Sequence, residues 1–158
     1  MKKQLMLLLL VISLFSFNKP EIQTDEKLSE EQLIFIKENY NWNSEDLIIV
    51  NFRQPQSSCH YDNYKNLKQS SDWWNDYYSK MKLNNIRNIF VYSDSNKATG
   101  IIDSKNHFSD VNNFFLENFF TEEQNCYGIL VFNKNGDFQK KSGEYTQDDI
   151  VEFQNILN

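Results

Sequence analysis

The chain has 158 residues, with 16 basic and 22 acidic side chains and 40% hydrophobic residues. This length suffices for one domain with a hydrophobic core, and nothing in the composition indicates a second domain. The formal net charge of −6 disfavours nucleic acid as a partner, because an acidic surface repels phosphate backbones. The four glycines, at positions 100, 128, 136 and 143, are too scattered to form a glycine-rich phosphate-binding loop.

Residues 1–17 have the pattern of a signal peptide. Lys2 and Lys3 precede an apolar run that reaches Phe15, and this run is too short to cross a bilayer as a helix. We therefore expect cleavage near Ser16 and an exported protein, either periplasmic or extracellular. Loss of the two lysines takes the formal net charge to −8. The alternative is an uncleaved segment that anchors the protein to a membrane.

The next residues, 18–28, are polar and without periodicity, and we expect them to form a flexible tether. The tether leads to a domain that spans residues 29–158. A first helix is predicted to begin after Ser29, because serine is a favoured N-cap. The apolar run from Leu47 to Phe52 predicts a strand that is buried on both faces of a sheet.

A long helical stretch is predicted to open at Cys59 and to continue to Met81. It contains four aromatic residues, Trp73, Trp74, Tyr77 and Tyr78. Two interpretations of these aromatic side chains stay open. They either cover the sheet or form a platform for a sugar or a groove for a peptide.

The second half of the chain continues the alternation of strands and helices. Residues 89–92 predict a second buried strand, which an irregular stretch through His107 follows. Ser109 is then expected to cap a short helix. Residues 129–132 and 138–141 predict two antiparallel strands around an Asn-Gly turn, and Thr146 is expected to cap a last helix. No metal or cofactor site is expected, because the two histidines, His60 and His107, lack ligand spacing.

This order predicts an α/β fold with a central mixed sheet of about four strands and helices on both faces. The first two strands are expected to be parallel, because a helix connects them by a right-handed crossover. The Asn-Gly hairpin then adds an antiparallel edge.

Two stretches of the chain resemble the thioredoxin-like superfamily. Residues 127–157 are similar to the end of thioredoxins and of exported bacterial thiol-disulfide oxidoreductases: a strand, an Asn-Gly hairpin, an edge strand, a glycine at Gly143 and a closing helix. Residues 46–62 resemble the strand, loop and cysteine-bearing helix start of the same families. The resemblance covers roughly residues 29–158 and implies a thioredoxin-like fold.

The active-site motif is degenerate relative to that superfamily. The enzymes carry C-x-x-C at the helix start, where this chain has Cys59, His60, Tyr61 and Asp62. Tyr127 stands in the region where the family places a cis-proline, and we expect an ordinary trans bond there. The resemblance makes His60, Tyr61, Asp62 and Tyr127 candidate binding residues.

Cys126 directly precedes Tyr127, and the resemblance implies that this position packs against the degenerate motif. Cys59 and Cys126 would then be neighbours in space, and disulfides persist in exported proteins. Two functions stay open. One is a redox-inactive module that binds a protein partner and in which the two cysteines form a permanent bridge. The other is a thiol-disulfide oxidoreductase acting on protein thiols, with Cys59 as the nucleophile, activated at a helix N-terminus, and Cys126 as the resolving cysteine.

Overall fold

The computed structural model describes residues 27–56, 58–60, 63–121 and 125–158. In this part of the chain five strands form one sheet in the order β3-β2-β1-β4-β5. The strands are β1 (Leu47–Arg53), β2 (Ile86–Tyr92), β3 (His107–Ser109), β4 (Tyr127–Asn133) and β5 (Phe138–Ser142). β2 is parallel to both β1 and β3, whereas β4 is antiparallel to both β1 and β5. The predicted α/β class with a mixed sheet is confirmed, with five strands where about four were expected.

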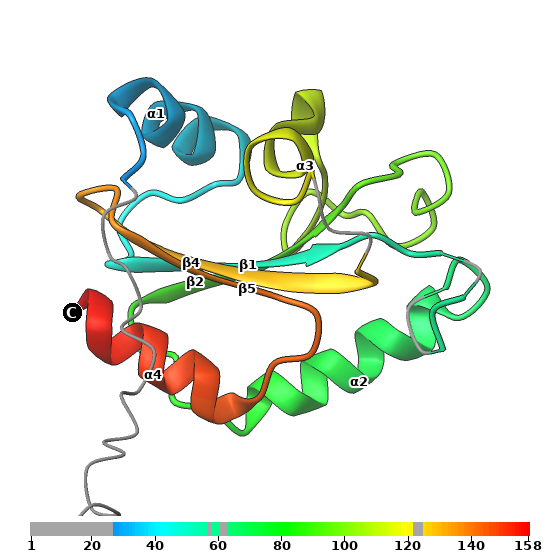
Figure 1. Ribbon diagram of the computed structural model, residues 1–158. Helices are drawn as coiled ribbons and strands as arrows, with labels where there is room; N and C mark the ends of the chain where they lie inside the picture. The colour runs from blue at the N-terminus through cyan, green and yellow to red at the C-terminus, as the bar shows by residue number, and fades with distance from the viewer. Residues whose placement is uncertain (1–26, 57, 61–62, 122–124) are drawn as a thin grey trace, which may run out of the picture.

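Helices cover both faces of this sheet, as predicted (Figure 1). α1 (Glu30–Asn39) and α3 (Phe114–Phe119) pack on one face, and α2 (Leu67–Ser79) and α4 (Gln147–Leu157) pack on the other. Among the described residues, no helix combines the length and the hydrophobicity that a membrane span requires.

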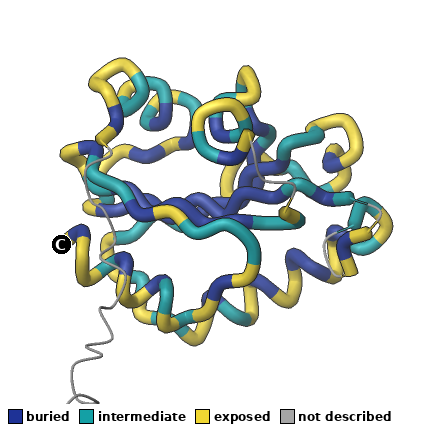
Figure 2. Tube along the Cα trace, viewed as in Figure 1, coloured by how far each residue is buried: buried dark blue, intermediate teal, exposed yellow. Residues whose placement is uncertain are grey.

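The central strand β1 is buried along its whole length, as its apolar run predicts. Alternate side chains of a strand point to opposite faces of its sheet, so β1 contributes to two hydrophobic cores. Ile48, Val50 and Phe52 belong to the core under α1 and α3, and Leu47 and Ile49 to the core under α2 and α4. Figure 2 shows that the buried residues follow the sheet and the inner sides of the helices.

Local signals place two helix starts and the hairpin where the sequence predicts them. Ser29 accepts a hydrogen bond from the Gln32 backbone N–H, and the Gln32 side chain accepts one from the Ser29 N–H. Thr146 and Asp149 form the same reciprocal pair at the start of α4. In the turn between β4 and β5, Gly136 has a φ of +90°, which favours glycine.

The helix predicted to open at Cys59 begins later, at Leu67, so that prediction is wrong. Side-chain amides explain the delay. Asn63 Nδ2 donates to the Cys59 carbonyl at 3.0 Å, and Asn66 Nδ2 donates to the His60 carbonyl at 3.2 Å. Such bonds compete with the backbone pairing of a helix. Cys59 therefore lies in the loop between β1 and α2.

The stretch expected to be irregular through His107 ends in a strand, β3. Asp103 Oδ1 accepts hydrogen bonds from three backbone N–H groups, those of Lys105, Asn106 and His107. This turn returns the chain to the sheet, where His107 pairs with Phe90 of β2. His107 is consequently a buried strand residue.

The short helix α3 is capped by Asp110, not by Ser109 as expected. The Asp110 carboxylate accepts hydrogen bonds from the backbone N–H groups of Phe115 and Leu116, both at 2.9 Å. A 3₁₀ turn, η1 (Val111–Asn113), separates the cap from the helix. A capping carboxylate thus acts across this turn, which the usual N-cap spacing does not anticipate.

The signal segment and most of the expected tether lie outside the described residues. The last two tether residues, however, belong to the folded domain. Lys27 bridges to Asp137 beside the hairpin, and the Leu28 N–H donates to the Gly136 carbonyl at 2.9 Å. Leu28 is buried in the core under α1. The folded domain therefore includes two residues that the polar composition assigns to the tether.

Candidate functional site

The two cysteines are joined. A disulfide links Cys59 to Cys126 with a Cα–Cα distance of 5.8 Å, which confirms that they lie within bridging reach. The pairing of β1 with β4 continues one step beyond the strands, because the Gln54 N–H donates to the Cys126 carbonyl at 2.9 Å. The sheet itself therefore brings the two cysteine-bearing loops together.

The environment of the bridge differs from the one expected of an activated thiol. Because α2 begins at Leu67, Cys59 does not sit in the first turn of a helix and gains no stabilisation from a helix N-terminus. Cys59 is also only 2% exposed. Cys126, by contrast, is half-buried, so it is the more accessible member of the pair.

The candidate binding residues around the bridge lie in different settings. His60 is exposed beside the bridge, whereas Tyr61 and Asp62 lie outside the described residues. Tyr127, the first residue of β4, lines a pocket. No cis peptide bond occurs among the described residues, in agreement with the trans bond expected before Tyr127.

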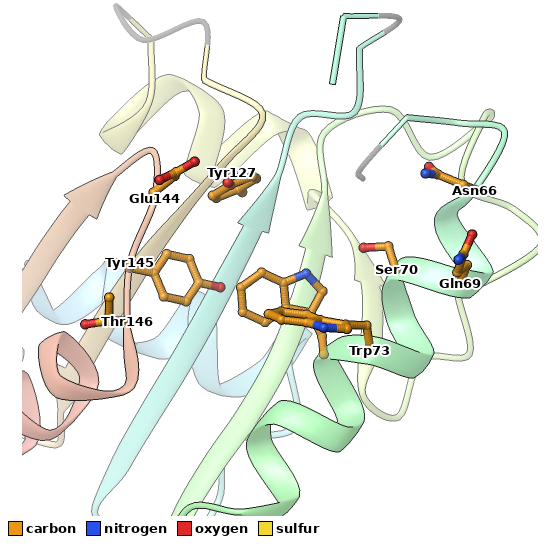
Figure 3. Close-up of a pocket in the computed structure, with 9 residues that line it drawn as sticks. Asn66, Gln69, Ser70, Trp73, Tyr127, Glu144, Tyr145 and Thr146 are labelled. Atoms are coloured by element: carbon orange, nitrogen blue, oxygen red, sulfur yellow. The ribbon is translucent and has the colours of Figure 1, made fainter. Parts of the chain in front are cut away.

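The pocket has a volume of about 500 Å³ and lies between α2 and the segment that joins β5 to α4 (Figure 3). It is lined by Asn66, Gln69, Ser70, Trp73, Trp74, Tyr127, Glu144, Tyr145 and Thr146. One lining residue, Tyr127, directly follows Cys126 of the disulfide in the sequence. Pockets of this size are typical of sites for small molecules.

Four of the residues that line the pocket are aromatic: Trp73, Trp74, Tyr127 and Tyr145. Trp74 stacks on Tyr145 with ring centres 5.3 Å apart and meets Tyr127 edge-on at 6.3 Å. Trp73 stacks on Tyr77 at 5.2 Å and is 56% exposed. The aromatic stripe therefore divides: Trp74 covers the sheet, whereas Trp73 presents its ring to solvent at the pocket.

A buried polar network supports this aromatic surface from beneath. The Arg53 side chain, 1% exposed, donates to the Tyr145 hydroxyl at 2.8 Å. The Tyr145 hydroxyl donates in turn to Asn51 Oδ1 at 2.6 Å, and Tyr78 donates to the same oxygen. Burial, with the nearby Tyr145 phenol, raises the pKa of Tyr78 well above its ordinary value, so its hydroxyl stays a donor.

One feature of the sequence indicates this network. Asn51 and Arg53 are polar residues at the end of a strand that is otherwise apolar, and both are buried. Buried polar groups require hydrogen-bond partners, so their position in a buried strand indicates a polar network. Which tyrosines complete it depends on the packing of α2 and α4.

His107 forms a second buried group of polar side chains, away from the pocket. Its Nε2 lies 3.3 Å from Ser71 Oγ, and its Nδ1 lies 3.2 Å from the Tyr92 hydroxyl. Burial lowers the pKa of His107, the Asp103 carboxylate raises it, and the Arg53 charge lowers it further. Because Ser71 and His107 are both buried and neither lines the pocket, this group holds α2 against the sheet.

No group of acidic, histidine and cysteine side chains within the described part of the chain is arranged to hold a metal ion. Searches of family models, curated proteins and solved structures find no match to this chain.

Proposed function

We propose that the protein is an exported thioredoxin-like binding module, in which Cys59–Cys126 is a structural bridge and the adjacent aromatic pocket receives the ligand. The observation that carries this proposal is the pocket itself. Trp73, which is 56% exposed, lines a cavity of about 500 Å³. Exposed aromatic surface beside a concave site is typical of ligand recognition.

The element order supports the thioredoxin-like part of the proposal. β1, α2 and β2 form a unit with parallel strands, and β4 and β5 form an antiparallel hairpin that α4 follows. The hairpin strand β4 pairs with β1, so β1 lies at the centre of the sheet. This is the arrangement that the resemblance to thioredoxins implies, with β3 as an additional edge strand.

The setting of Cys59 supports a structural role for the bridge. A catalytic disulfide needs a stabilised thiolate. Cys59 is buried in a loop and does not lie at the N-terminus of a helix. The bridge closes a sequence separation of 67 residues, which in the chain-entropy model stabilises the fold by roughly 4 kcal/mol. An apolar leader and a disulfide are also consistent with export to an oxidising compartment.

One observation favours the second candidate, a thiol-disulfide oxidoreductase. Cys126 is half-buried, so an incoming protein thiolate would attack the Cys126 sulfur. The bond from Cys126 to Cys59 would break as the mixed disulfide forms, and Cys59 would leave as the thiolate. This order reverses the roles that the resemblance implies, because Cys59 would be the resolving cysteine.

A redox titration separates the two candidates. Oxidised protein is equilibrated with glutathione or dithiothreitol buffers, free thiols are counted by mass spectrometry, and circular dichroism follows the fold. For the binding module we expect a potential below about −300 mV, with reduction only as the domain unfolds. A higher potential with the fold intact, together with exchange activity that Cys59→Ser abolishes, would establish the oxidoreductase instead.

Binding itself is tested with the indole N–H signal of Trp73 in NMR spectra. The protein is screened against a mixed library of short peptides, sugars and aromatic small molecules. We expect at least one class to shift this signal in the wild type, and titration calorimetry to show that Trp73→Ala binds the same class more weakly. If no class does so, the pocket is not a binding site and the proposal fails.

A further inference from the structure

The side chains on the pocket walls limit the chemical class of its ligand. Gln69 lies one helical turn before Trp73 on the same face of α2, beside the exposed ring. Glu144 lies on the opposite wall, in the segment after β5 (Figure 3). Both side chains are exposed, and neither makes a hydrogen bond within the described part of the chain. An apolar ring face is thus flanked by an amide and a carboxylate that face the cavity.

The charges around the pocket favour a neutral ligand. Glu144 is the one charged residue among the described residues that line it, and its carboxylate disfavours an anion. A cationic ligand is disfavoured by a positive charge that lies beneath the aromatic rings. The Arg53 guanidinium lies beneath the rings, 4.3 Å from the centre of Trp74, 5.5 Å from Tyr127 and 5.7 Å from Tyr145. Its positive charge repels a second cation, and it already interacts with three of the four aromatic rings that line the pocket, all except Trp73.

The backbone around the pocket disfavours a peptide that binds as an added β-strand. Peptides that add to a sheet pair with the main chain of an edge strand. The edge strands are β3 and β5, and β5 ends at Ser142, before the lining residues begin at Glu144. The remaining lining residues belong to α2, to the segment that precedes it and to the inner strand β4. The ligand must therefore be recognised by side chains, through one apolar face and a polar edge.

We propose that the pocket binds a neutral carbohydrate. The C–H face of a sugar ring stacks on the Trp73 indole, while Gln69 and Glu144 hydrogen-bond its hydroxyl groups. A neutral sugar has the apolar face, the polar edge and the absence of charge that the pocket requires. The cavity of about 500 Å³ lies within the range of small-molecule sites. This inference rests on the proposed function and names the class of ligand for the same site.

The test titrates the protein with neutral trisaccharides of glucose and of N-acetylglucosamine. It follows the Trp73 indole signal in the wild type and the heat of binding by titration calorimetry in the wild type and in every variant. We expect a saturable shift with at least one of them. Trp73→Ala should weaken the binding about tenfold or more, because it removes the stacking surface. Trp73 is exposed, so this variant should keep the fold, which circular dichroism checks. The matched control is Ile34→Ala on α1, which removes an exposed apolar side chain from the other face of the sheet and should leave binding unchanged.

Two further measurements distinguish the possible ligands. Binding of a neutral sugar should change little with ionic strength, and Glu144→Gln should weaken it severalfold, because one hydroxyl partner is altered. Binding only of acidic or basic sugars, with a strong dependence on salt, would overturn the inference. If short peptides shift the Trp73 signal and sugars do not, the inference fails while the proposed binding module stands. If none of the peptides, sugars and aromatic small molecules shifts the signal, both fail.

Discussion

The guanidinium of Arg53 lies 4.3 Å from the centre of the Trp74 ring, and both side chains are buried. Arg53 is the last residue of β1, whereas Trp74 is in the middle of α2. The same arginine donates to Tyr145 in the segment before α4. One side chain therefore connects the central strand to both helical regions that border the pocket.

Replacement of Arg53 by lysine tests this connection. Lysine keeps the charge but lacks the planar group that stacks on Trp74 and bonds to Tyr145. We expect Arg53→Lys to lower the free energy of unfolding by roughly 1–3 kcal/mol in urea denaturation. The control is Arg87→Lys, since Arg87 is half-buried and bonds the Lys105 carbonyl and Asn106 near the surface. Equal losses in both variants would show that the stack on Trp74 contributes no special stability.

The disulfide gives a second prediction on stability. Replacement of both Cys59 and Cys126 by serine should lower the free energy of unfolding by roughly 4 kcal/mol, because the unfolded chain gains entropy. Intact-mass analysis of the wild-type protein should show two hydrogen atoms fewer than the reduced chain. Treatment of the wild-type protein with dithiothreitol should reproduce the loss. An unchanged stability in both experiments would contradict a structural role for the bridge.

The parts of this fold that sequence patterns predict are those with local causes. The Ser29 and Thr146 caps, the Asn-Gly turn and the buried strand β1 each depend on a few neighbouring residues. The proximity of Cys59 to Cys126 was implied by the resemblance to thioredoxins, since no local pattern pairs two distant cysteines.

The start of α2, the strand β3 and the pocket were not predicted, because they depend on contacts that the periodicity of apolar residues does not reveal. The start of α2 is set by the amides of Asn63 and Asn66, whose bonds to carbonyl groups outweigh the helical periodicity of the apolar residues. β3 has three residues and one core side chain, Phe108, so it lacks an apolar run. The pocket forms only when Trp73 of α2 and Glu144 are brought to opposite walls.

Asp110 gives a prediction on pH. Burial raises the pKa of this carboxyl from 3.8 to about 6, against the lowering effect of hydrogen bonds from Phe115 and Leu116, while the Glu117 charge raises it further. The Tyr40 hydroxyl also bonds it and lowers its pKa. Because this pKa is raised in the folded state, the contribution of Asp110 to the free energy of unfolding is full below pH 3.8. It is lost as the pH rises through about 6.

The variant Asp110→Asn should remove this dependence. Relative to the variant, the wild-type free energy of unfolding should increase by roughly 3 kcal/mol as the pH falls from neutral to about 4. Urea denaturation at a series of pH values measures the difference. Asp72→Asn, at an exposed carboxylate that pairs with Lys68, is the control and should run parallel to the wild type. A constant difference between wild type and Asp110→Asn would show that the carboxyl keeps its ordinary pKa.

His107 gives the opposite dependence. Its pKa is lowered, chiefly by burial, so the folded protein binds fewer protons than the unfolded chain. The contribution of His107 to stability is therefore full above the unfolded pKa of 6.5 and is lost as the pH falls below that value. Since Asp110 acts in the opposite sense over part of this range, the measurement belongs in an Asp110→Asn background.

In that background His107→Gln should abolish the decline of unfolding free energy below pH 6.5 that is due to the imidazole. Glutamine keeps a hydrogen-bonding group near Ser71 and Tyr92 but does not titrate. The exposed residue His60 provides the matched control, and His60→Gln should leave the decline in place. Retention of the full decline in His107→Gln would mean that other groups cause it. Because Ser71 belongs to α2, loss of the imidazole contacts in acid should loosen this helix first, which hydrogen exchange of the α2 amides detects.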